Sequence, residues 1–407
     1  MPANSLESVI DWLTLGARSA QRPDQFVLET CERMVACGIP LWRVGVFARM
    51  LHPNMLGRNF IWRRDEGVTM GAMAHGEEET DLFLSSPLAI VFLQGEEVRR
   101  RLTTADAANV PFFAEIRAEG ATDYVAFPLH MSDGTVHALS LITQAPGGFT
   151  DTQLDDMRGM MPPLTRMVEI FLLRRTAAGL LDSYVGARAG ARILAGQIRR
   201  GHTESMNAAI WLSDLRGFTP LSDRLPSEAV VDILNRYFDC QVPAILDHGG
   251  EVMKFMGDGL LAVFPIADKA GDTEAVCRRV LDAARECRAN IAAMTYDYES
   301  ETLGNFRFGL ALHIGKVLYG NIGGGDRLDF TCIGPAVNLA ARIEKIAGRL
   351  NRTVLASTEF ASHVDADWTD LGLFSVAGFS APERVYGLPD ETSAANMRQP
   401  DSPASAG

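Results

Sequence analysis

Two stretches in the C-terminal half of the chain each place a carboxylate at the end of an apolar run. In MNAAIWLSDLRGF the run ends at Asp214, and in KFMGDGLLAVFP an apolar run follows Asp258, which stands between two glycines. Apolar runs bounded by turn residues predict buried strands, and the Gly-Asp-Gly turn predicts a hairpin. Because a buried carboxylate is costly unless it is paired or bound to a metal, we expect neighbouring strands to bring Asp214 and Asp258 together.

Two adjacent carboxylates offer the oxygen ligands that hard divalent cations prefer, and Mg²⁺ commonly completes its shell with waters and substrate phosphates. The glycines beside Asp258 let the chain turn sharply and leave space for a bulky polyphosphate. Taken singly, a carboxylate at a strand end is more often a capping or turn residue. Two of them on strands expected to be neighbours predict a metal site.

The residues after Asp214 predict a second part of the same site. Gly217, Phe218 and Thr219 lead into a helix whose first N–H groups have no partner within the helix. A helix N-terminus favours anions, and this one would suit the β- and γ-phosphates of a nucleotide.

A further helix, expected from Pro335, carries a polar pair. Asn338 and Arg342 are four residues apart and therefore share one face of the helix. An amide and a guanidinium on one face can hold a ribose and an α-phosphate, since the planar donors of arginine match phosphate oxygens. The alternative is a solvent-facing arginine that is paired with a carboxylate such as Glu344.

Strands and helices alternate through the C-terminal half. The expected strands cover 206–218, the two sides of the 251–265 hairpin, 305–323 and 327–334, and the expected helices cover 226–247, 270–297 and 335–350. A short αβ tail closes the unit near residue 388. The order βαββαβ with added elements predicts an α/β (α+β) fold with a ferredoxin-like, palm-type sheet and helices packed on one face.

The motifs WLSDLRGFTPLS, GGEVMKFMGDGLLAVF and FTCIGPAVNLAARIE stand in this order over residues 205–345, which resemble the catalytic domain of class III nucleotide cyclases. The resemblance implies a catalytic domain over 205–390 that forms its active site at a homodimer interface, with two Mg²⁺ or Mn²⁺ ions per site. The implied reaction converts ATP into 3′,5′-cyclic AMP and pyrophosphate. By motif, the implied residues are Asp214, Leu215 and Asp258 for the metals, Gly217, Phe218 and Thr219 for the substrate, Asn338 for the ribose and Arg342 for the transition state.

In that family a pair of residues selects the purine, and by motif this pair is Lys254 and Thr331. Lysine can donate to N1 of adenine and the threonine hydroxyl can accept from N6, whereas N1 of guanine is a donor that lysine cannot satisfy. The pair therefore favours ATP, and Cys332 is not the guanine-type cysteine, because the position seven before Asn338 is Thr331. The resemblance further implies that Lys254 and Asp258 serve opposite active sites of the dimer. A threonine at this position resembles the branch that includes bicarbonate-responsive cyclases, so bicarbonate stimulation is a hypothesis.

The chain departs from the family pattern at one position. Where the family often carries a lysine that contacts the triphosphate, this chain has Ala377 in the stretch VAGFS. Arg349 or Arg352 could supply the missing donor; without it, losing a charge-assisted contact of about 1.5–3 kcal/mol would slow turnover roughly 10- to 100-fold. Two alternatives to an adenylate cyclase remain, a catalytically weak or dead cyclase-like regulatory module, which Ala377 supports, and a guanylate cyclase, which Lys254 disfavours.

Residues 1–170 predict a separate α/β domain. The expected elements are two helices within 5–37 with caps at Ser5 and Asp24, strands at 41–50, 59–65, 122–131 and 135–144, and a helix from Thr150 that Pro162 and Pro163 kink or interrupt. The stretch VAFPLHMSDGTVHALSLITQAPGGFTDTQLDDM resembles part of a GAF sensory domain, which implies regulation by an unidentified small molecule or protein. The alternative is an unrelated α/β regulatory domain.

Residues 171–204, rich in Ala, Gly and Arg, predict a helical signalling linker, with a passive linker as the alternative. Residues 391–407 are small, polar and without periodicity, which predicts a disordered tail.

Composition narrows the classes of partner and compartment. A net charge of −13 argues against nonspecific nucleic-acid binding. Six scattered cysteines without a C-x-x-C pair are typical of reduced thiols in a cytoplasmic protein, and no signal peptide is evident. The apolar run 82–94 is too short to span a bilayer and contains Pro87. These features predict a soluble cytoplasmic protein with no membrane span.

Overall fold

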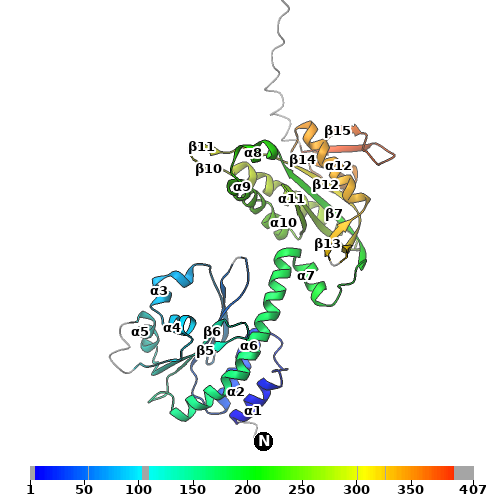
Figure 1. Ribbon diagram of the computed structural model, residues 1–407. Helices are drawn as coiled ribbons and strands as arrows, with labels where there is room; N and C mark the ends of the chain where they lie inside the picture. Colours follow the sequence, from blue (N-terminus) through cyan, green and yellow to red (C-terminus); the bar gives the residue numbers. More distant parts are fainter. Residues whose placement is uncertain (1–4, 54, 103–109, 300, 326, 389–407) are drawn as a thin grey trace, which may run out of the picture. The chain divides into compact units, whose positions relative to one another are not determined.

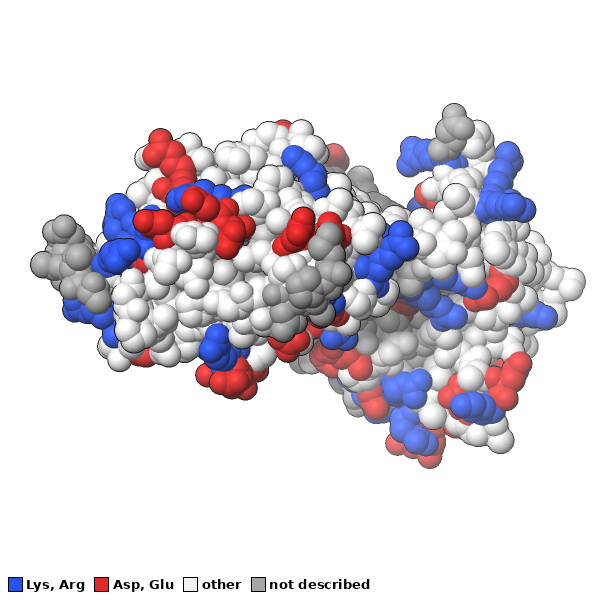
Figure 2. Space-filling view, turned by 90° about the horizontal axis from the view of Figure 1, so that it is seen from below, with Lys and Arg blue, Asp and Glu red and all other residues white. Residues whose placement is uncertain are grey.

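The computed structural model describes residues 5–53, 55–102, 110–299, 301–325 and 327–388, so the expected tail at 391–407 lies outside the described residues. The chain divides into two compact units, Met1–Ser183 and Tyr184–Gly407. Within the described residues, no helix combines the length and the apolar character needed to cross a membrane. Acidic and basic side chains intermingle on the face shown in Figure 2.

The first unit is built on one antiparallel sheet of six strands in the order β3-β2-β1-β6-β5-β4. Figure 1 labels its strands β5 and β6. Its strands are β1 Arg43–Arg49, β2 Gly57–Arg63, β3 Gly67–Met73, β4 Val98–Arg101, β5 Asp123–His130 and β6 Val136–Thr143. Its helices are α1 Leu6–Thr14, α2 Pro23–Ala36, a 3-10 turn at Glu77–Glu79, α3 Asp81–Leu84, α4 Pro87–Gln94, α5 Pro111–Ala118 and α6 Asp151–Val185.

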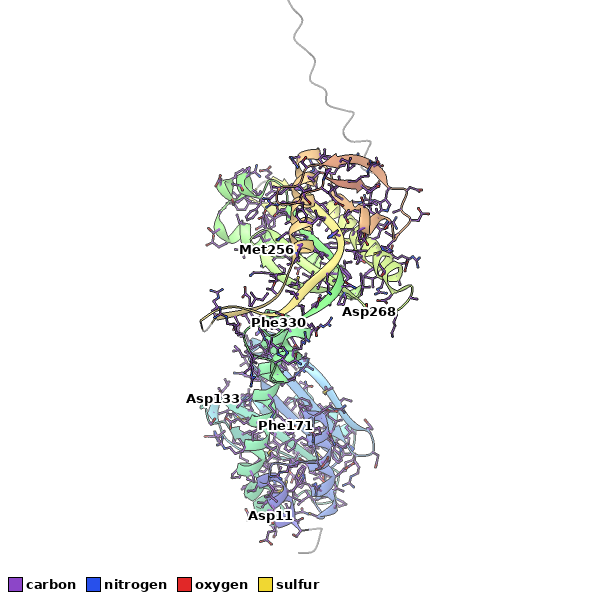
Figure 3. The ribbon with its side chains drawn as sticks, turned by 90° about the vertical axis from the view of Figure 1, so that its right-hand side faces the viewer. Asp11, Asp133, Phe171, Met256, Asp268 and Phe330 are labelled. Carbon is purple, nitrogen blue, oxygen red and sulfur yellow. The ribbon has the colours of Figure 1, made fainter. Side chains whose placement is uncertain are left out.

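Helices cover both faces of this sheet because its central strands are apolar on both sides. Along β5, Val125 and Phe127 belong to a buried cluster with α1, α2 and α6, whereas Tyr124 and Ala126 belong to a second cluster with α4 and α5. Phe171 of α6, labelled in Figure 3, lies in the first cluster. The alternation follows from the two-residue period of a strand.

Helix α6 runs unbroken through Pro162 and Pro163, so the expected interruption there is wrong. Each proline lacks the N–H that a helix interior uses, so the backbone forgoes two hydrogen bonds. Met160 and Leu164, on either side of the prolines, are buried in the core with the sheet, and this burial stabilises the helix across the gap.

Helix starts in this unit agree with the sequence at one position and differ at another. Ser5 caps α1 as expected, because its hydroxyl accepts a hydrogen bond from the N–H of Ser8 at 3.3 Å. Asp24 does not cap α2, because Arg22 holds the N-cap position and Pro23 occupies the first helical turn. Proline suits that position since its missing N–H would have no helical partner there.

His137 of β6 makes the first unit sensitive to acid. The ring is buried, its Nδ1 accepts a hydrogen bond from the N–H of Arg49 at 2.9 Å, and burial lowers the pKa of His137 from 6.5 to about 4. Because the unfolded chain takes up the proton at a higher pH than the folded chain, stability is complete above about pH 6.5 and is lost as the pH falls towards 4. The loss at pH 5 amounts to about 2 kcal/mol.

The variant His137→Asn retains an acceptor but cannot be protonated. We therefore expect its melting temperature to be lower than that of wild type at pH 7.5, and equal to it or higher at pH 5. Thermal unfolding of the full chain at the two pH values measures the difference, with the exposed His130→Asn as control. A difference between variant and wild type that is the same at both pH values would contradict the assignment.

The second unit contains a larger sheet in the order β15-β16-β14-β12-β7-β9-β8, with β13 paired to β12. Its strands are β7 Thr203–Leu215, β8 Glu251–Met256, β9 Gly259–Ile266, β12 Phe308–Gly324, β13 Arg327–Ile333, β14 Val354–Ser357, β15 Thr369–Phe374 and β16 Glu383–Gly387, and a separate pair is β10 Tyr296–Tyr298 with β11 Glu301–Leu303. Its helices are α7 Ala187–Leu194, α8 Phe218–Arg224, α9 Ser227–Asp239, α10 Val242–Asp247, α11 Asp272–Ala293, α12 Pro335–Leu350 and α13 Thr358–Ala361.

The central part of this sheet confirms the expected ferredoxin-like order. Strands β7, β8, β9 and β12 are the four strands of the βαββαβ unit, and they lie in the spatial order β12-β7-β9-β8, with all neighbours antiparallel. The first strand of the unit is therefore central, between the last strand and the second strand of the hairpin.

The expectation that helices cover one face is wrong. Trp211 of β7 lies in a core with α9, α10 and α11, while the adjacent Ile210 lies in a core with α12 and α7 on the opposite face. Because β7 is apolar at consecutive positions, both of its faces need cover. The single helix expected over 226–247 is divided into α9 and α10, because Pro243 cannot donate a helical hydrogen bond and is accommodated in the first turn of α10.

Candidate active site

Strand pairing brings the two predicted metal carboxylates to one edge of the sheet. Asp214 lies one residue before the end of β7 and is paired in register with Gly259, the first residue of β9. Asp258 occupies the turn just before Gly259, and its carbonyl oxygen accepts a hydrogen bond from the N–H of Leu215 at 3.3 Å. The two aspartates are therefore neighbours across a strand pair, as the sequence predicts.

The glycines of the Gly-Asp-Gly turn have separate roles. Gly257 has φ of +67°, in the left-handed region that residues with a Cβ rarely adopt. Gly259 lies against β7, where an added Cβ would lie 3.2 Å from the carbonyl oxygen of Ser213 and 3.4 Å from Oδ1 of Asp214. A side chain at 259 would crowd the Asp214 carboxylate, so the glycine leaves room beside it.

The electrostatics of this edge fit a cation site. Burial, together with the negative charges of Asp258 and Glu344, raises the pKa of Asp214 to about 6, and the charge of Arg216 partly offsets this rise. Among the described residues, no group of three or more His, Cys, Asp and Glu side chains is arranged to hold a metal. The protein ligands would be the two carboxylates and the main-chain oxygen of Leu215, whose side chain is apolar and buried. A magnesium-type ion with so few protein ligands takes its remaining oxygens from water and substrate phosphates.

An ion pair that local sequence does not predict lies next to the carboxylate pair. Arg216, two residues after Asp214, pairs with the buried Glu344 of α12 at 2.7 Å between Nη2 and Oε1. The two residues lie 128 positions apart, and nothing in a single sequence would join them. This pair fixes α12 against the loop that follows the carboxylates.

The predicted phosphate-binding segment follows directly. Gly217 has φ of +73° and precedes α8, which begins at Phe218, and both Gly217 and Thr219 are exposed. Pro220 has no N–H, so the main-chain donors at this helix start come from Gly217, Phe218 and Thr219. These three residues follow Leu215 by two to four positions, so their N–H groups stand on the segment that leaves the carboxylate pair.

Asn338 and Arg342 are exposed on α12, as a shared helix face predicts. The alternative pairing of Arg342 with Glu344 is wrong, because Glu344 is bound to Arg216. Arg342 and Glu344 stand two positions apart on α12, which is roughly 200° around the helix axis, so Arg342 leaves the helix on the side away from Glu344. Within the described residues of this chain, Arg342 has no recorded ion pair or hydrogen bond.

Lys254 forms a contact that the sequence analysis missed. Its Nζ donates to Oδ2 of Asp329 in β13 at 2.6 Å, and this hydrogen bond, with the charge of Lys254, lowers the pKa of Asp329. Asp329 and Thr331 are two positions apart on β13 and so lie on one face of the strand. The two-residue period of a strand indicates that Asp329 shares a face with Thr331, but it does not indicate the contact with Lys254, which lies 75 positions away. Among the described residues, no ion pair joins Lys254 to Asp258.

The position of Ala377 is exposed, in the turn after β15. Of the two arginines considered as substitutes, Arg349 is exposed, whereas Arg352 has a buried Nη1 without a hydrogen-bond partner among the described residues. The segment that carries Arg352 lies near the carboxylate edge, because Arg307 donates to Asn351 while the carbonyl oxygen of Arg307 accepts from the N–H of Arg216 at 2.7 Å.

Apolar side chains are exposed beside this site. Phe255 and Met256 at the end of β8 are 51% and 42% exposed, and Leu328 and Ile333 of β13 are 38% and 44% exposed. Met256 is labelled in Figure 3 together with Phe330, which lies between the two β13 residues in sequence but is buried. Exposed apolar residues on neighbouring strands are typical of a surface that another protein surface covers.

Residues 202–386 match the family model described as the adenylate and guanylate cyclase catalytic domain. A terminal-differentiation-specific adenylate cyclase of Dictyostelium discoideum is 33% identical over 152 residues, which cover 36% of this chain and 7% of that protein. Adenylate cyclase 1 of Rhizobium meliloti is 31% identical over 147 residues, 36% of this chain and 21% of that protein. An uncharacterized protein of Mycobacterium tuberculosis is 31% identical over 212 residues, 52% of this chain and 35% of that protein.

Solved structures of both nucleotide specificities are similar to the same part. The adenylyl cyclase CyaB from P. aeruginosa is 29% identical over 46% of this chain and 95% of that chain, with a TM-score of 0.38. The guanylyl cyclase Cya2 is 26% identical over 48% of this chain and 97% of that chain, with a TM-score of 0.36. The similarity to the curated relatives spans at most about a third of their length.

Proposed function

We propose that this chain is an adenylate cyclase that converts ATP into 3′,5′-cyclic AMP and pyrophosphate, because residues 202–386 match the adenylate and guanylate cyclase catalytic domain. The observation that carries the proposal is that Asp214 and Asp258 lie next to each other across the β7–β9 pair. The charge of Arg216 does not fully compensate the negative charges around Asp214, so its pKa stays raised. Such a pair is suited to two divalent ions, Mg²⁺ or Mn²⁺, bound together with the triphosphate.

The residues of the chain then have distinct tasks in an in-line displacement. Bound divalent ions would acidify the ribose 3′-hydroxyl and neutralise the leaving pyrophosphate. The N–H groups at Gly217, Phe218 and Thr219 bind the β- and γ-phosphates. Asn338 orients the ribose, and Arg342 stabilises the charge that develops on the α-phosphate while the bond from O3′ to phosphorus forms and the bond to the bridging oxygen breaks.

The direction of Arg342 supports a site shared between two copies of the chain. Arg342 faces away from the carboxylates of its own chain, because Glu344 on the other side of α12 approaches them. The exposed apolar residues of β8 and β13 offer a surface on which a second copy can pack. We therefore propose a homodimer in which each active site combines carboxylates from one protomer with Asn338 and Arg342 from its partner.

Two features bear on the alternative of a catalytically weak module. Ala377 lacks the donor that the family often has, but the unpartnered Nη1 of Arg352, on a segment near the carboxylate edge, is suited to replace it on the pyrophosphate. We further propose that the first unit and residues 171–204 regulate the cyclase unit. The assignment of the first unit to the GAF-like domains stays a prediction.

The proposed function is tested by incubating the full chain with ATP or GTP and with Mg²⁺ or Mn²⁺, and identifying the product by chromatography and mass spectrometry. Cyclic AMP from ATP, with little cyclic GMP from GTP, is the expected result. Cyclic GMP as the main product would favour the guanylate cyclase alternative, and no cyclic product from either nucleotide would favour the regulatory module.

Lys254 is expected to carry the choice of base. Replacing it in Lys254→Met removes the donor to adenine N1, and we expect kcat/KM for ATP to fall at least about tenfold while the low activity with GTP changes little. Steady-state kinetics with both nucleotides measure the ratio, and Lys269→Met, at an exposed lysine of the same unit, is the control. An equal loss with ATP and GTP would show that Lys254 does not read the base.

A further inference from the structure

The first unit contains a cavity of about 600 Å³, within the size range of small-molecule sites. Strands β1, β2, β5 and β6 form one wall, and the segments that carry α3, α4 and α5 form the other. Aromatic side chains line it from both sides: Phe47, Phe83, Phe92, Phe112 and Tyr124. No residue of the proposed cyclase site contributes to this cavity.

Three polar atoms in the lining are buried and lack a hydrogen-bond partner among the described residues. They are Nη1 of Arg43, Oγ of Ser86 and the hydroxyl oxygen of Tyr124. Tyr124 is only 1% exposed. Buried polar groups are nearly always bonded in native proteins, so three unpaired groups around one cavity indicate a missing polar partner.

Positive charge accompanies these groups. Arg43 stands over the ring of Phe112 at 5.6 Å, and burial lowers the pKa of Arg43, which the charge of Arg63 lowers further. Glu115 is near enough to oppose this effect, but Arg43 has no ion pair with it among the described residues. Arg49 stands over Phe92 at 5.0 Å, and within the described part of the chain its guanidinium has no ion pair either. The cavity therefore holds two arginines without carboxylate partners.

Three acidic residues also line the cavity, Glu77, Glu78 and Glu115. Glu77 accepts a hydrogen bond from the N–H of Ala74, and Glu78 accepts one from the N–H of Gly76. Glu77 and Glu78 thus accept from the main chain of their own turn, whereas Nη1 of Arg43 and the hydroxyl of Tyr124 have no hydrogen-bond partner among the described residues. A neutral apolar ligand would leave these donors unpaired, whereas a charged acceptor group placed beside Arg43 would satisfy them.

We propose that this cavity is a binding site for a small organic anion with a flat aromatic or heteroaromatic body. The anionic group accepts hydrogen bonds from Arg43 and from the hydroxyl groups of Tyr124 and Ser86, and the flat body packs between the aromatic side chains.

Indole-3-acetate and 1-naphthoate are suitable probes, because each joins a carboxylate to a flat ring system. Isothermal titration of the full chain should show saturable binding of one molecule per chain for at least one of them. Indole-3-acetamide has the same shape without the charge, and it should bind at least about tenfold more weakly than indole-3-acetate. Equal affinity for the acid and the amide, or no saturable binding of either acid, would overturn the proposal.

Two variants locate the binding within the cavity. Tyr124→Phe keeps the buried ring and removes only the hydroxyl group, and it should weaken binding about fivefold. Arg43→Met removes the charge and should weaken binding at least about tenfold, while Arg64→Met, at an exposed arginine of the same unit, should leave it unchanged. Binding that survives both Tyr124→Phe and Arg43→Met would place the probe elsewhere. The readout is binding to the first unit, so the result does not depend on the cyclase activity.

Discussion

Asp214→Asn is expected to abolish cyclase activity and, at the same time, to stabilise the metal-free protein. The activity should fall at least about a hundredfold, because the substitution removes a charged oxygen ligand from a site that has few protein ligands. The stability gain has a separate cause. The carboxylate is half-buried near Asp258 and Glu344, and its pKa is raised to about 6.

The sign of the stability effect follows from this raised pKa. The folded chain holds the Asp214 proton up to about pH 6 while the unfolded chain releases it near pH 4, so the carboxylate destabilises the fold increasingly as the pH rises from 4 to 6. Above that range the full penalty applies, and Asp214→Asn should relieve it by an amount on the order of 1 kcal/mol after allowance for solvent screening.

Thermal unfolding in EDTA measures this effect. The melting temperature of Asp214→Asn should exceed that of wild type at pH 7.5 and equal it near pH 4, and Asp223→Asn, at an exposed carboxylate of α8, should show no such dependence. Added Mg²⁺ or Mn²⁺ with a nucleotide should stabilise wild type more than the variant. If Asp214→Asn were less stable than wild type at pH 7.5 without metal, the carboxylate pair would not be strained in the way described.

The second large effect concerns Arg342. Arg342→Ala should lower kcat at least about a hundredfold with little change in KM, because the lost interaction forms only in the transition state. Because Arg342 is exposed, its replacement should not disturb the core, and a folding defect would not explain such a loss.

Mixing two inactive variants tests whether each site is shared between protomers. A heterodimer of Asp214→Asn with Arg342→Ala contains one site with both defects and one intact site, so random mixing should restore up to about a quarter of wild-type activity. Asp214→Asn mixed with Asp258→Asn should restore none, because both changes affect the same half-site. If heterodimers of the first pair form, as judged by copurification of two tags, but stay inactive, each chain would form its site alone.

Several features of the fold follow from local sequence alone. The apolar runs and the Gly-Asp-Gly turn predict β7, β8 and β9, and the order of elements predicts the ferredoxin-like arrangement that places Asp214 beside Asp258. The four-residue spacing of Asn338 and Arg342 predicts their shared exposed face. These features depend on strand period, helix period and turn chemistry, which neighbouring residues determine.

Other features depend on residues far apart in the chain. The pairing of Arg216 with Glu344, the contact between Lys254 and Asp329, and the cover on both faces of the second sheet could not be read from local patterns. Neither could the continuity of α6 through two prolines, since burial against the sheet outweighs the local loss of hydrogen bonds.

The amino-acid sequence by itself determined which residues have the chemistry for a cation and a nucleotide, and on which elements they stand. Only the tertiary structure decided which charges are paired and which remain unpaired, because that depends on the side chains that packing brings from distant segments. Glu344 is paired with Arg216, while Arg342 is exposed and Arg43 lines a cavity without an ion pair to any described carboxylate. The free energy of a buried charge depends on its neighbours, and the fold selects those neighbours.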